Sequence, residues 1–238
     1  MNIDLDYAAA GPLPLAVGSV PLLANIGGST GLSPAALSNG LAESLGRPLS
    51  GPPLRQHVVP GDRVVIALPG RLPGGGEMLE LVVRGLIDSL TAGGVAPDDI
   101  AVLTAPPLDL LGPEEVSGRQ TAALPTGLTE QTIRFQPEMD DETAYLLADG
   151  NNEPLHLARE LVDADVVVAV ETFSVDPALG GRTPAGELWP GFARQDRRLT
   201  LVRSLLETRR PVLEAWRRLA AAVTDQLGLL ASLRLMPG

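Results

Sequence analysis

Arg63–Leu68 (RVVIAL) is the stretch that decides the fold, and it directly follows the turn signal Pro60-Gly61-Asp62. Its last five residues are apolar and three of them are β-branched. A short continuous apolar run of this kind is typical of a strand that is buried on both faces of a parallel sheet. Two further runs have the same character, Ile100–Ala105 (IAVLTA) and Val166–Val170 (VVVAV).

The segment between the first two runs predicts a helix. Glu77–Thr91 has apolar residues at helical spacing, and Ala92-Gly93-Gly94 follows as a glycine stop signal. A strand, a helix and a strand joined by short connections favour a right-handed parallel crossover. The predicted fold class is therefore α/β: a Rossmann-like, mostly parallel sheet with flanking helices and a helical C-terminal segment.

Weaker patterns predict the remaining elements, and no internal repeat accompanies them. The 26 glycines and 22 prolines indicate many turns between these elements. The expected helices and helical turns are Ser33-Pro34 to about Leu45, Leu54–Val58, a helix starting at Pro113, Leu155–Val162 (helical or mixed), and Asp196–Leu227, broken at Pro211. The expected strands are Leu15–Ile26, Thr132–Phe135, Ala144–Ala148 and Leu229–Leu235.

Composition excludes several classes of chemistry. All 18 Lys and Arg residues are arginine, so the 238-residue chain can form no lysine Schiff base and no P-loop lysine contact. It has no cysteine, which removes disulfides, thiolate nucleophiles and Cys-ligated zinc. The net charge of −11 disfavours nucleic acid and anionic membrane surfaces as partners.

The N-terminal residues predict a cytoplasmic protein. Asp4 and Asp6 stand where a signal peptide would carry basic residues. The apolar stretch Leu13–Ile26 is too short for a membrane span, and prolines and a glycine interrupt it. The lack of cysteine agrees with a reducing compartment.

Candidate site residues lie in loops that follow the expected strands, because open α/β sheets bind ligands at the carboxyl ends of their strands. After the first strand, Pro69–Gly76 (PGRLPGGG) leads into a helix N-terminus that favours an anion. Arg71 could clamp the anion there, beside the loop glycines Gly74 and Gly75. The second loop, Pro106–Gly112, offers only Asp109 as an ionisable group.

The third loop, Glu171–Gly191, is long and glycine-rich. Such a loop is either functional or a structural excursion, here packed by Phe173 and Trp189. Its ionisable residues that could line a pocket are Glu171, Asp176, Arg182 and Glu187. No metal site is expected, because neither His57 nor His156 has a second ligand at metal-binding spacing.

Several segments together resemble the N-terminal domain of the nickel-pincer-dependent lactate racemase family. The resemblance spans roughly Ala36–Ala193 and rests on the order and spacing of segments rather than on one motif. The carrying segments are Gly51–Arg55 (GPPLR), Pro60–Ile66 (PGDRVVI), Asp98–Ala105 (DDIAVLTA) with Glu114-Glu115 behind it, Ala164–Val168 (ADVVV) and Trp189-Pro190-Gly191.

The resemblance implies a domain organisation. Residues 35–195 would form the family's N-terminal α/β domain, residues 1–34 an irregular or strand segment of the same domain, and residues 196–238 a helical C-terminal segment. The family's second domain is expected to be absent or truncated. In the family, the active site lies in the cleft between the two domains.

The resemblance also implies a cofactor and a reaction. The family uses a pincer nucleotide that is tethered to a lysine and holds nickel, which a histidine completes. Two further histidines move the proton while hydride passes to and from the pincer ring, and an arginine binds the 2-hydroxy acid that is inverted.

Few of those residues carry over to this chain. The family's Asp-His-Thr-Arg-Pro loop corresponds to Pro69–Pro73, which keeps only Arg71. The first catalytic histidine falls on Leu108 and the second near Asp176. The tethering lysine falls near Gly186 or Glu187, and the nickel histidine near Val202. We therefore predict no bound cofactor and the loss of racemase activity.

Three hypotheses remain open for the function. The chain is a non-catalytic relative (a pseudoenzyme) that binds a small anionic ligand or a partner. Alternatively, it is an enzyme with repurposed chemistry, in which Arg71 binds an anionic substrate and Asp176, Glu171 or Asp109 acts as acid or base. A third alternative is a subunit that completes its cleft with another protein or with a second copy of itself.

Overall fold

The computed structural model describes residues 2–6, 12–16, 32–68, 75–106, 132–172, 188–207 and 209–235. The chain divides into two compact units, Met1–Leu32 together with Gly238, and Ser33–Pro237. The first unit contains an antiparallel hairpin of β1 (Asn2–Asp6) and β2 (Pro12–Ala16). The strand expected at Leu15–Ile26 overlaps the end of β2, and its remainder lies outside the described residues.

The second unit is built on a five-stranded sheet in which every pair of neighbouring strands is parallel. Its strands are β3 (Val64–Leu68), β4 (Ile100–Thr104), β5 (Thr132–Arg134), β8 (Val166–Thr172) and β9 (Leu229–Leu235). Their spatial order is β5-β4-β3-β8-β9. Counted along the chain within this sheet, that is the order 3-2-1-4-5 of a Rossmann sheet. The predicted fold class is confirmed.

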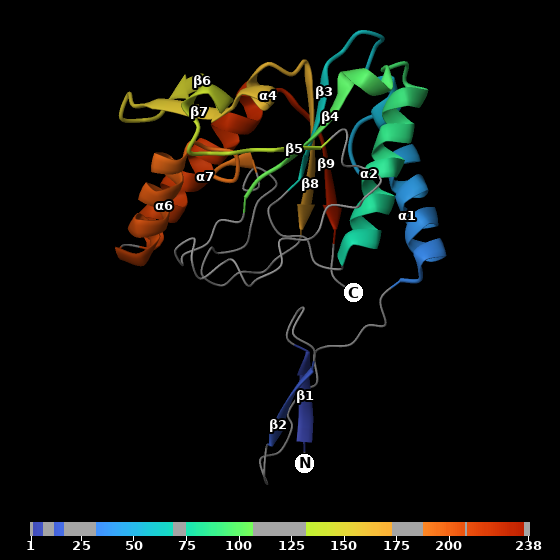
Figure 1. Ribbon diagram of the computed structural model, residues 1–238, viewed down its shortest axis with the longest axis horizontal. Helices are drawn as coiled ribbons and strands as arrows, with labels where there is room; N and C mark the ends of the chain where they lie inside the picture. Colours follow the sequence, from blue (N-terminus) through green and yellow to red (C-terminus); the bar gives the residue numbers. More distant parts are fainter. Residues whose placement is uncertain are drawn as a thin grey trace. The chain divides into compact units, whose positions relative to one another are not determined.

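One face of the sheet is covered by α1 (Pro34–Gly46) and α2 (Gly75–Ala92), which lie on the same side in Figure 1. Ser33 caps α1, as expected, because its Oγ accepts the Ala36 N–H at 3.3 Å. On α2, the side chains of Val82, Leu86 and Leu90 are buried in the same cluster as the inner strands. Their spacing is the helical pattern that the sequence shows.

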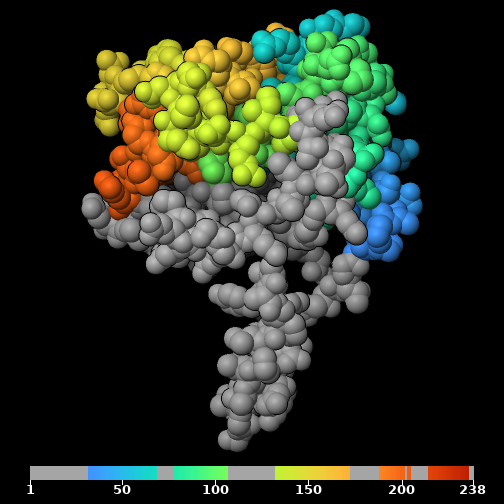
Figure 2. Space-filling view, viewed as in Figure 1, coloured from blue at the N-terminus to red at the C-terminus, as the bar shows by residue number. Residues whose placement is uncertain are grey.

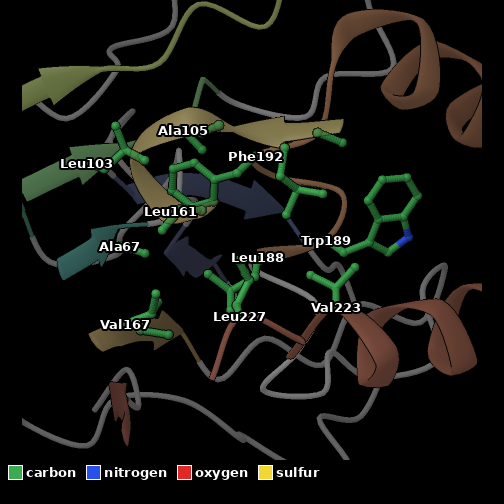
Figure 3. Close-up of a cluster of buried hydrophobic side chains, with 14 of the residues drawn as sticks. Ala67, Leu103, Ala105, Leu161, Val167, Leu188, Trp189, Phe192, Val223 and Leu227 are labelled. Carbon is green, nitrogen blue, oxygen red and sulfur yellow. The ribbon is translucent and has the colours of Figure 1, made fainter. Parts of the chain in front are cut away.

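The other face is covered by helices and a small hairpin, on the opposite side of the sheet in Figure 1. These elements are β6 (Thr143–Ala148), β7 (Pro154–Ala158), α4 (Arg159–Val162), α6 (Gln195–Glu207) and α7 (Arg209–Gln226). Figure 3 shows part of the cluster beneath them, where Leu161 and Phe192 lie near Leu103 and Ala67 of the sheet. In Figure 2, the orange atoms of α6 adjoin the yellow atoms of the β6–β7 hairpin.

One expectation is confirmed in one of its two forms, and another needs correction. Leu155–Val162, expected to be helical or mixed, is mixed: Pro154–Ala158 is the strand β7, and Arg159–Val162 is the helix α4. Leu155 and Leu157 are buried in the core cluster, and their strand pairs with β6, a contact that the local pattern does not reveal. The C-terminal helices do not break at Pro211, which lies in the first turn of α7, where a proline is tolerated.

The remaining short elements agree with the turn signals of the sequence. The helical turn expected at Leu54–Val58 is a 3-10 helix, η2 (Leu54–Gln56). Two further 3-10 turns, η3 (Pro97–Asp99) and η4 (Asp140–Glu142), precede β4 and β6. The helix expected from Pro113 lies outside the described residues.

We predict that Gly93→Ala destabilises the protein. A Cβ at residue 93 would lie 2.5 Å from Val58 Cγ2 and 2.8 Å from the Arg55 carbonyl oxygen. Overpacking of this kind costs roughly 1–3 kcal/mol, measurable by urea unfolding. Gly40→Ala, on the exposed face of α1 with no atom within 4 Å, is the control and should stabilise by about 0.5–1 kcal/mol. Equal effects of the two substitutions would contradict this packing.

Candidate functional site

The candidate site lies where β3 and β8 end, because the chain leaves these neighbouring strands toward opposite faces. After β3 it enters α2 on one face, and after β8 it reaches α6 and α7 on the other face before β9. Ligands of open α/β sheets bind at the carboxyl ends of the strands beside such a switch point. The strand order therefore selects, among the expected loops, the two that follow β3 and β8.

The predicted site residues are distributed over the segments that leave these strands. Gly75 is the first residue of α2, so the loop after β3 leads into the N-terminus of an 18-residue helix. Glu171 lies in β8 near its carboxyl end. The other predicted site residues lie outside the described part of the chain: Arg71 and Gly74 after β3, Asp109 after β4, and Asp176, Arg182 and Glu187 after β8.

Glu171 is buried, with 2% of its surface exposed, and forms an ion pair with the neighbouring strand. Its register partner in β9 is Arg234, whose Nη2 lies 3.6 Å from Glu171 Oε2. Removing a carboxylate from water is costly unless a cation and hydrogen bonds compensate it. The Arg234 side chain is 40% exposed, so the positive charge of the pair lies at the protein surface and the carboxylate lies inside.

Arg198 of α6 is a second buried charged residue near this edge, with 4% exposure. Its Nη1 donates to the Gly191 carbonyl at 3.0 Å and its Nη2 to the Pro106 carbonyl at 2.9 Å. Pro106 follows β4, and Gly191 lies in the segment between β8 and α6. One guanidinium therefore fixes the backbone of two chain segments that leave the sheet at its carboxyl edge.

The segment Leu188–Ala193, which returns from the loop after β8, is held at several backbone atoms. The Trp189 carbonyl accepts Trp216 Nε1 of α7 at 3.1 Å. The Phe192 carbonyl accepts the Ala158 N–H of β7 at 2.9 Å. An irregular segment can be buried only when its polar backbone groups have partners. These bonds give the loop after β8 a fixed end.

The two histidines do not lie at this edge of the sheet. His57 closes η2, beside the end of α2 and before β3 begins, which is the amino edge. His156 lies in β7, where its ring meets Tyr145 edge-on with centroids 6.0 Å apart. Among the described residues, no three His, Cys, Asp or Glu side chains are grouped so that they could hold a metal ion.

The electrostatic contacts of α6 anchor the β6–β7 hairpin. Asp149 Oδ1 accepts the backbone N–H groups of Glu153 at 3.0 Å and Asn151 at 2.9 Å, and its Oδ2 lies 3.4 Å from Arg197 Nη1. The hydrogen bond from Glu153, followed by that from Asn151 and the charge of Arg197, lowers the pKa of Asp149 below its ordinary 3.8 against the effect of burial. The carboxylate form of Asp149 therefore stabilises this turn.

Sequence reasoning missed Arg198 and Arg234. Arg198 precedes Leu201 by three residues, and Leu201 packs against the core, so both lie on the inward side of α6. A basic residue on the apolar side of a helix is a signal that could have identified Arg198. Arg234 had no such signal, because its role depends on the register between β8 and β9.

These features define an α/β protein with a Rossmann-ordered sheet and a candidate ligand site at its switch point. Its fold is similar to the lactate racemase apoprotein from Thermoanaerobacterium thermosaccharolyticum, at a TM-score of 0.67 and 14% identity, over 100% of this chain and 56% of that one. A Thermotoga maritima protein is similar at a TM-score of 0.52 and 13% identity, over 86% of this chain and 51% of that one.

At these identities, the comparisons show the fold alone. The chain spans about half the length of the two solved structures. No protein-family model matches the chain, and no curated protein matches its sequence.

We predict that Arg198→Met destabilises the protein by about 2–4 kcal/mol, because the carbonyls of Pro106 and Gly191 lose a charged donor in a buried place. The check is urea unfolding of the purified variant. Arg203→Met, at an exposed position of the same helix, is the control and should stay within about 0.5 kcal/mol of wild type. Similar losses in both variants would show that the two carbonyl bonds are not the cause.

We predict that in Asp149→Asn the free energy of unfolding depends less on pH in the acid range. The pKa of Asp149 is lower in the folded protein than its ordinary 3.8, so the carboxylate contributes stability above that value. This contribution is lost as the pH falls through the folded pKa. Unfolding free energies measured from pH 6 down to about pH 2 should therefore fall less in the variant. Asp163→Asn, at an exposed position after α4, is the control.

Proposed function

We propose that this chain is a lactate-racemase-like α/β domain that binds a small anionic ligand and does not carry out nickel-pincer chemistry. The observation that supports the proposal is the strand order 3-2-1-4-5, because the chain passes from β3 into the N-terminus of α2 beside the switch point between β3 and β8. A helix N-terminus favours a negative charge, and an arginine recognises carboxylate or phosphate by paired hydrogen bonds.

The residues of this chain do not fit the tethered nickel-pincer group of the lactate racemase family. A lysine tether cannot form, because all 18 Lys and Arg residues are arginine. The chain has two histidines, His57 at the amino edge of the sheet and His156 in the β6–β7 hairpin. Neither is placed to bind a metal or to move a proton at the carboxyl edge of the sheet.

The burial of Glu171 at the carboxyl end of β8 favours a second candidate function, an enzyme that uses carboxylates as acid and base. In that case Arg71 would hold an anionic substrate, with Glu171, Asp176 or Asp109 as the proton-transferring group. The ion pair with Arg234 argues for a fixed charge at Glu171 instead. Chiral analysis of D- and L-lactate after incubation with the protein tests one form of this alternative: interconversion would favour the enzyme, because a binding domain leaves both enantiomers unchanged.

We also propose a cytoplasmic location and a protein partner. In the described part of the chain, no helix combines the length and the apolar composition that crossing a membrane requires. The proposed partner is another protein or a second copy of this chain, and size-exclusion chromatography with light scattering of the purified protein tests for the second copy.

We predict that L-lactate, D-lactate or inorganic phosphate raises the melting temperature of the protein. A ligand at about 100 times its dissociation constant stabilises the native state by roughly 2.7 kcal/mol, which is several degrees for a domain of this size. Arg71→Ala should abolish the shift, and Arg47→Ala, which removes an equal charge after α1, should keep it. Binding of nickel at one ion per chain, measured by elemental analysis, would oppose the proposal.

A further inference from the structure

The five-stranded sheet has two edge strands, β5 and β9, and they differ in length and in charge. β5 is three residues long and contains the exposed Arg134. β9 is seven residues long and contains no proline. An edge strand presents N–H and C=O groups to other chains, and shortness, charges, prolines and bulges are the usual protection against pairing with them. β5 has two of these protections, shortness and charge.

The outer edge of β9 has little protection. A bulge lies at its start, where Leu230 is the extra residue opposite Val167 and Val168, and the register is regular from Ala231 onward. The single charged residue of the strand is Arg234, whose guanidinium lies 3.6 Å from the buried Glu171 carboxylate of β8. This charge is therefore held on the β8 side of the strand. Within the described residues, β8 is the only strand that pairs with β9.

The apolar side chains of β9 are only half-buried, although they pack against the core on both faces of the sheet. Leu229 packs against the cluster on the α7 side, and Ala231, Leu233 and Leu235 pack against the cluster on the α1 and α2 side. A further strand beside β9 would remove part of this apolar surface from water. The edge thus offers main-chain hydrogen-bonding groups and apolar side chains to the same partner.

We propose that β9 is a dimerisation edge: it pairs antiparallel with β9 of a second copy of this chain, so that two five-stranded sheets join across a two-fold axis. The inference rests on the proposed protein partner and identifies it as a second copy. An interface of this symmetry must be self-complementary. With the axis at Ser232, the central residue of the strand, all seven residues pair, and the small Ala231 lies opposite the larger Leu233 of the second copy.

The charges of the strand favour this register. The net charge of −11 makes two copies repel each other, but Leu229–Leu235 contains no Asp or Glu. With the axis at Ser232, Arg234 lies opposite Leu230 of the second copy, which separates the two arginines by about 14 Å along the strands. An axis at Leu233 would halve this separation. The register about Ser232 therefore brings the apolar residues together and keeps the like charges apart.

The first test measures self-association by size-exclusion chromatography with light scattering at several protein concentrations. The wild-type protein should form a dimer that dissociates on dilution. Ser232→Lys puts two ammonium groups directly opposite each other in the dimer, and should raise its dissociation constant about two- to fivefold. Ser38→Lys, which adds the same charge at an exposed position of α1, is the control and should leave the constant unchanged.

The second test uses a disulfide to locate the interface. The chain has no cysteine, so Ser232→Cys introduces a single thiol. Opposite residues of an antiparallel pair have Cα atoms about 4.5–5.5 Å apart, which a disulfide can span. Oxidation with copper phenanthroline should therefore convert Ser232→Cys to a covalent dimer, seen by non-reducing electrophoresis. Ser38→Cys, treated in the same way, should stay largely monomeric.

The outcomes separate this inference from the proposed function. If the wild-type protein is monomeric at every concentration, the inference fails together with the second copy as partner, while ligand binding is decided separately by the melting-temperature shifts. If a dimer forms but Ser232→Cys cross-links no faster than Ser38→Cys, the role of β9 is overturned and self-association stands. The cross-linking result decides the question even if Ser232→Lys does not fold.

Discussion

The central strands of this protein have no polar face, and the rest of the second unit follows from that constraint. Every residue of β3 is buried, and β4 and β8 flank it on either side. Such a strand loses its hydrophobic stabilisation unless both faces of the sheet are covered. The chain therefore sends α1 and α2 to one face and α6, α7 and the β6–β7 hairpin to the other. The switch point between β3 and β8 is the geometric result of this division.

The second face of the sheet is covered in part by an irregular segment. Because this segment is buried, its backbone N–H and C=O groups need hydrogen-bond partners within the protein. In the segment Leu188–Ala193, two helices and a strand supply these partners. The side chains of Trp216 and Arg198 donate to backbone carbonyls of the segment, and the Ala158 N–H of β7 donates to the Phe192 carbonyl. Arg198 also reaches Pro106 after β4. The packing of α6 and α7 is thereby linked to the backbone that leaves the sheet at its carboxyl edge.

The sequence predicts the inner strands well because their signal is local. The runs at β3, β4 and β8 are continuous, and α1 and α2 show caps and helical spacing that depend on no distant residue. Elements defined by pairing are harder to predict. β7 is a strand because β6 lies beside it, and the break between α6 and α7 does not fall at Pro211. The contacts of Arg198 and the Glu171–Arg234 ion pair are tertiary in origin, so no window of sequence shows them.

The sheet of an α/β protein and the chemistry of its loops depend on different residues, so the fold alone does not determine the function. The sheet needs buried, apolar, β-branched residues in its strands, such as Val64, Ile66 and Val168. Their packing does not depend on the identity of the loop residues. The resemblance to the lactate racemase family would require a lysine near Gly186 or Glu187 and histidines at Leu108 and near Val202, and the chain has neither residue type at these positions. Similarity of fold at 14% identity is therefore compatible with a changed site.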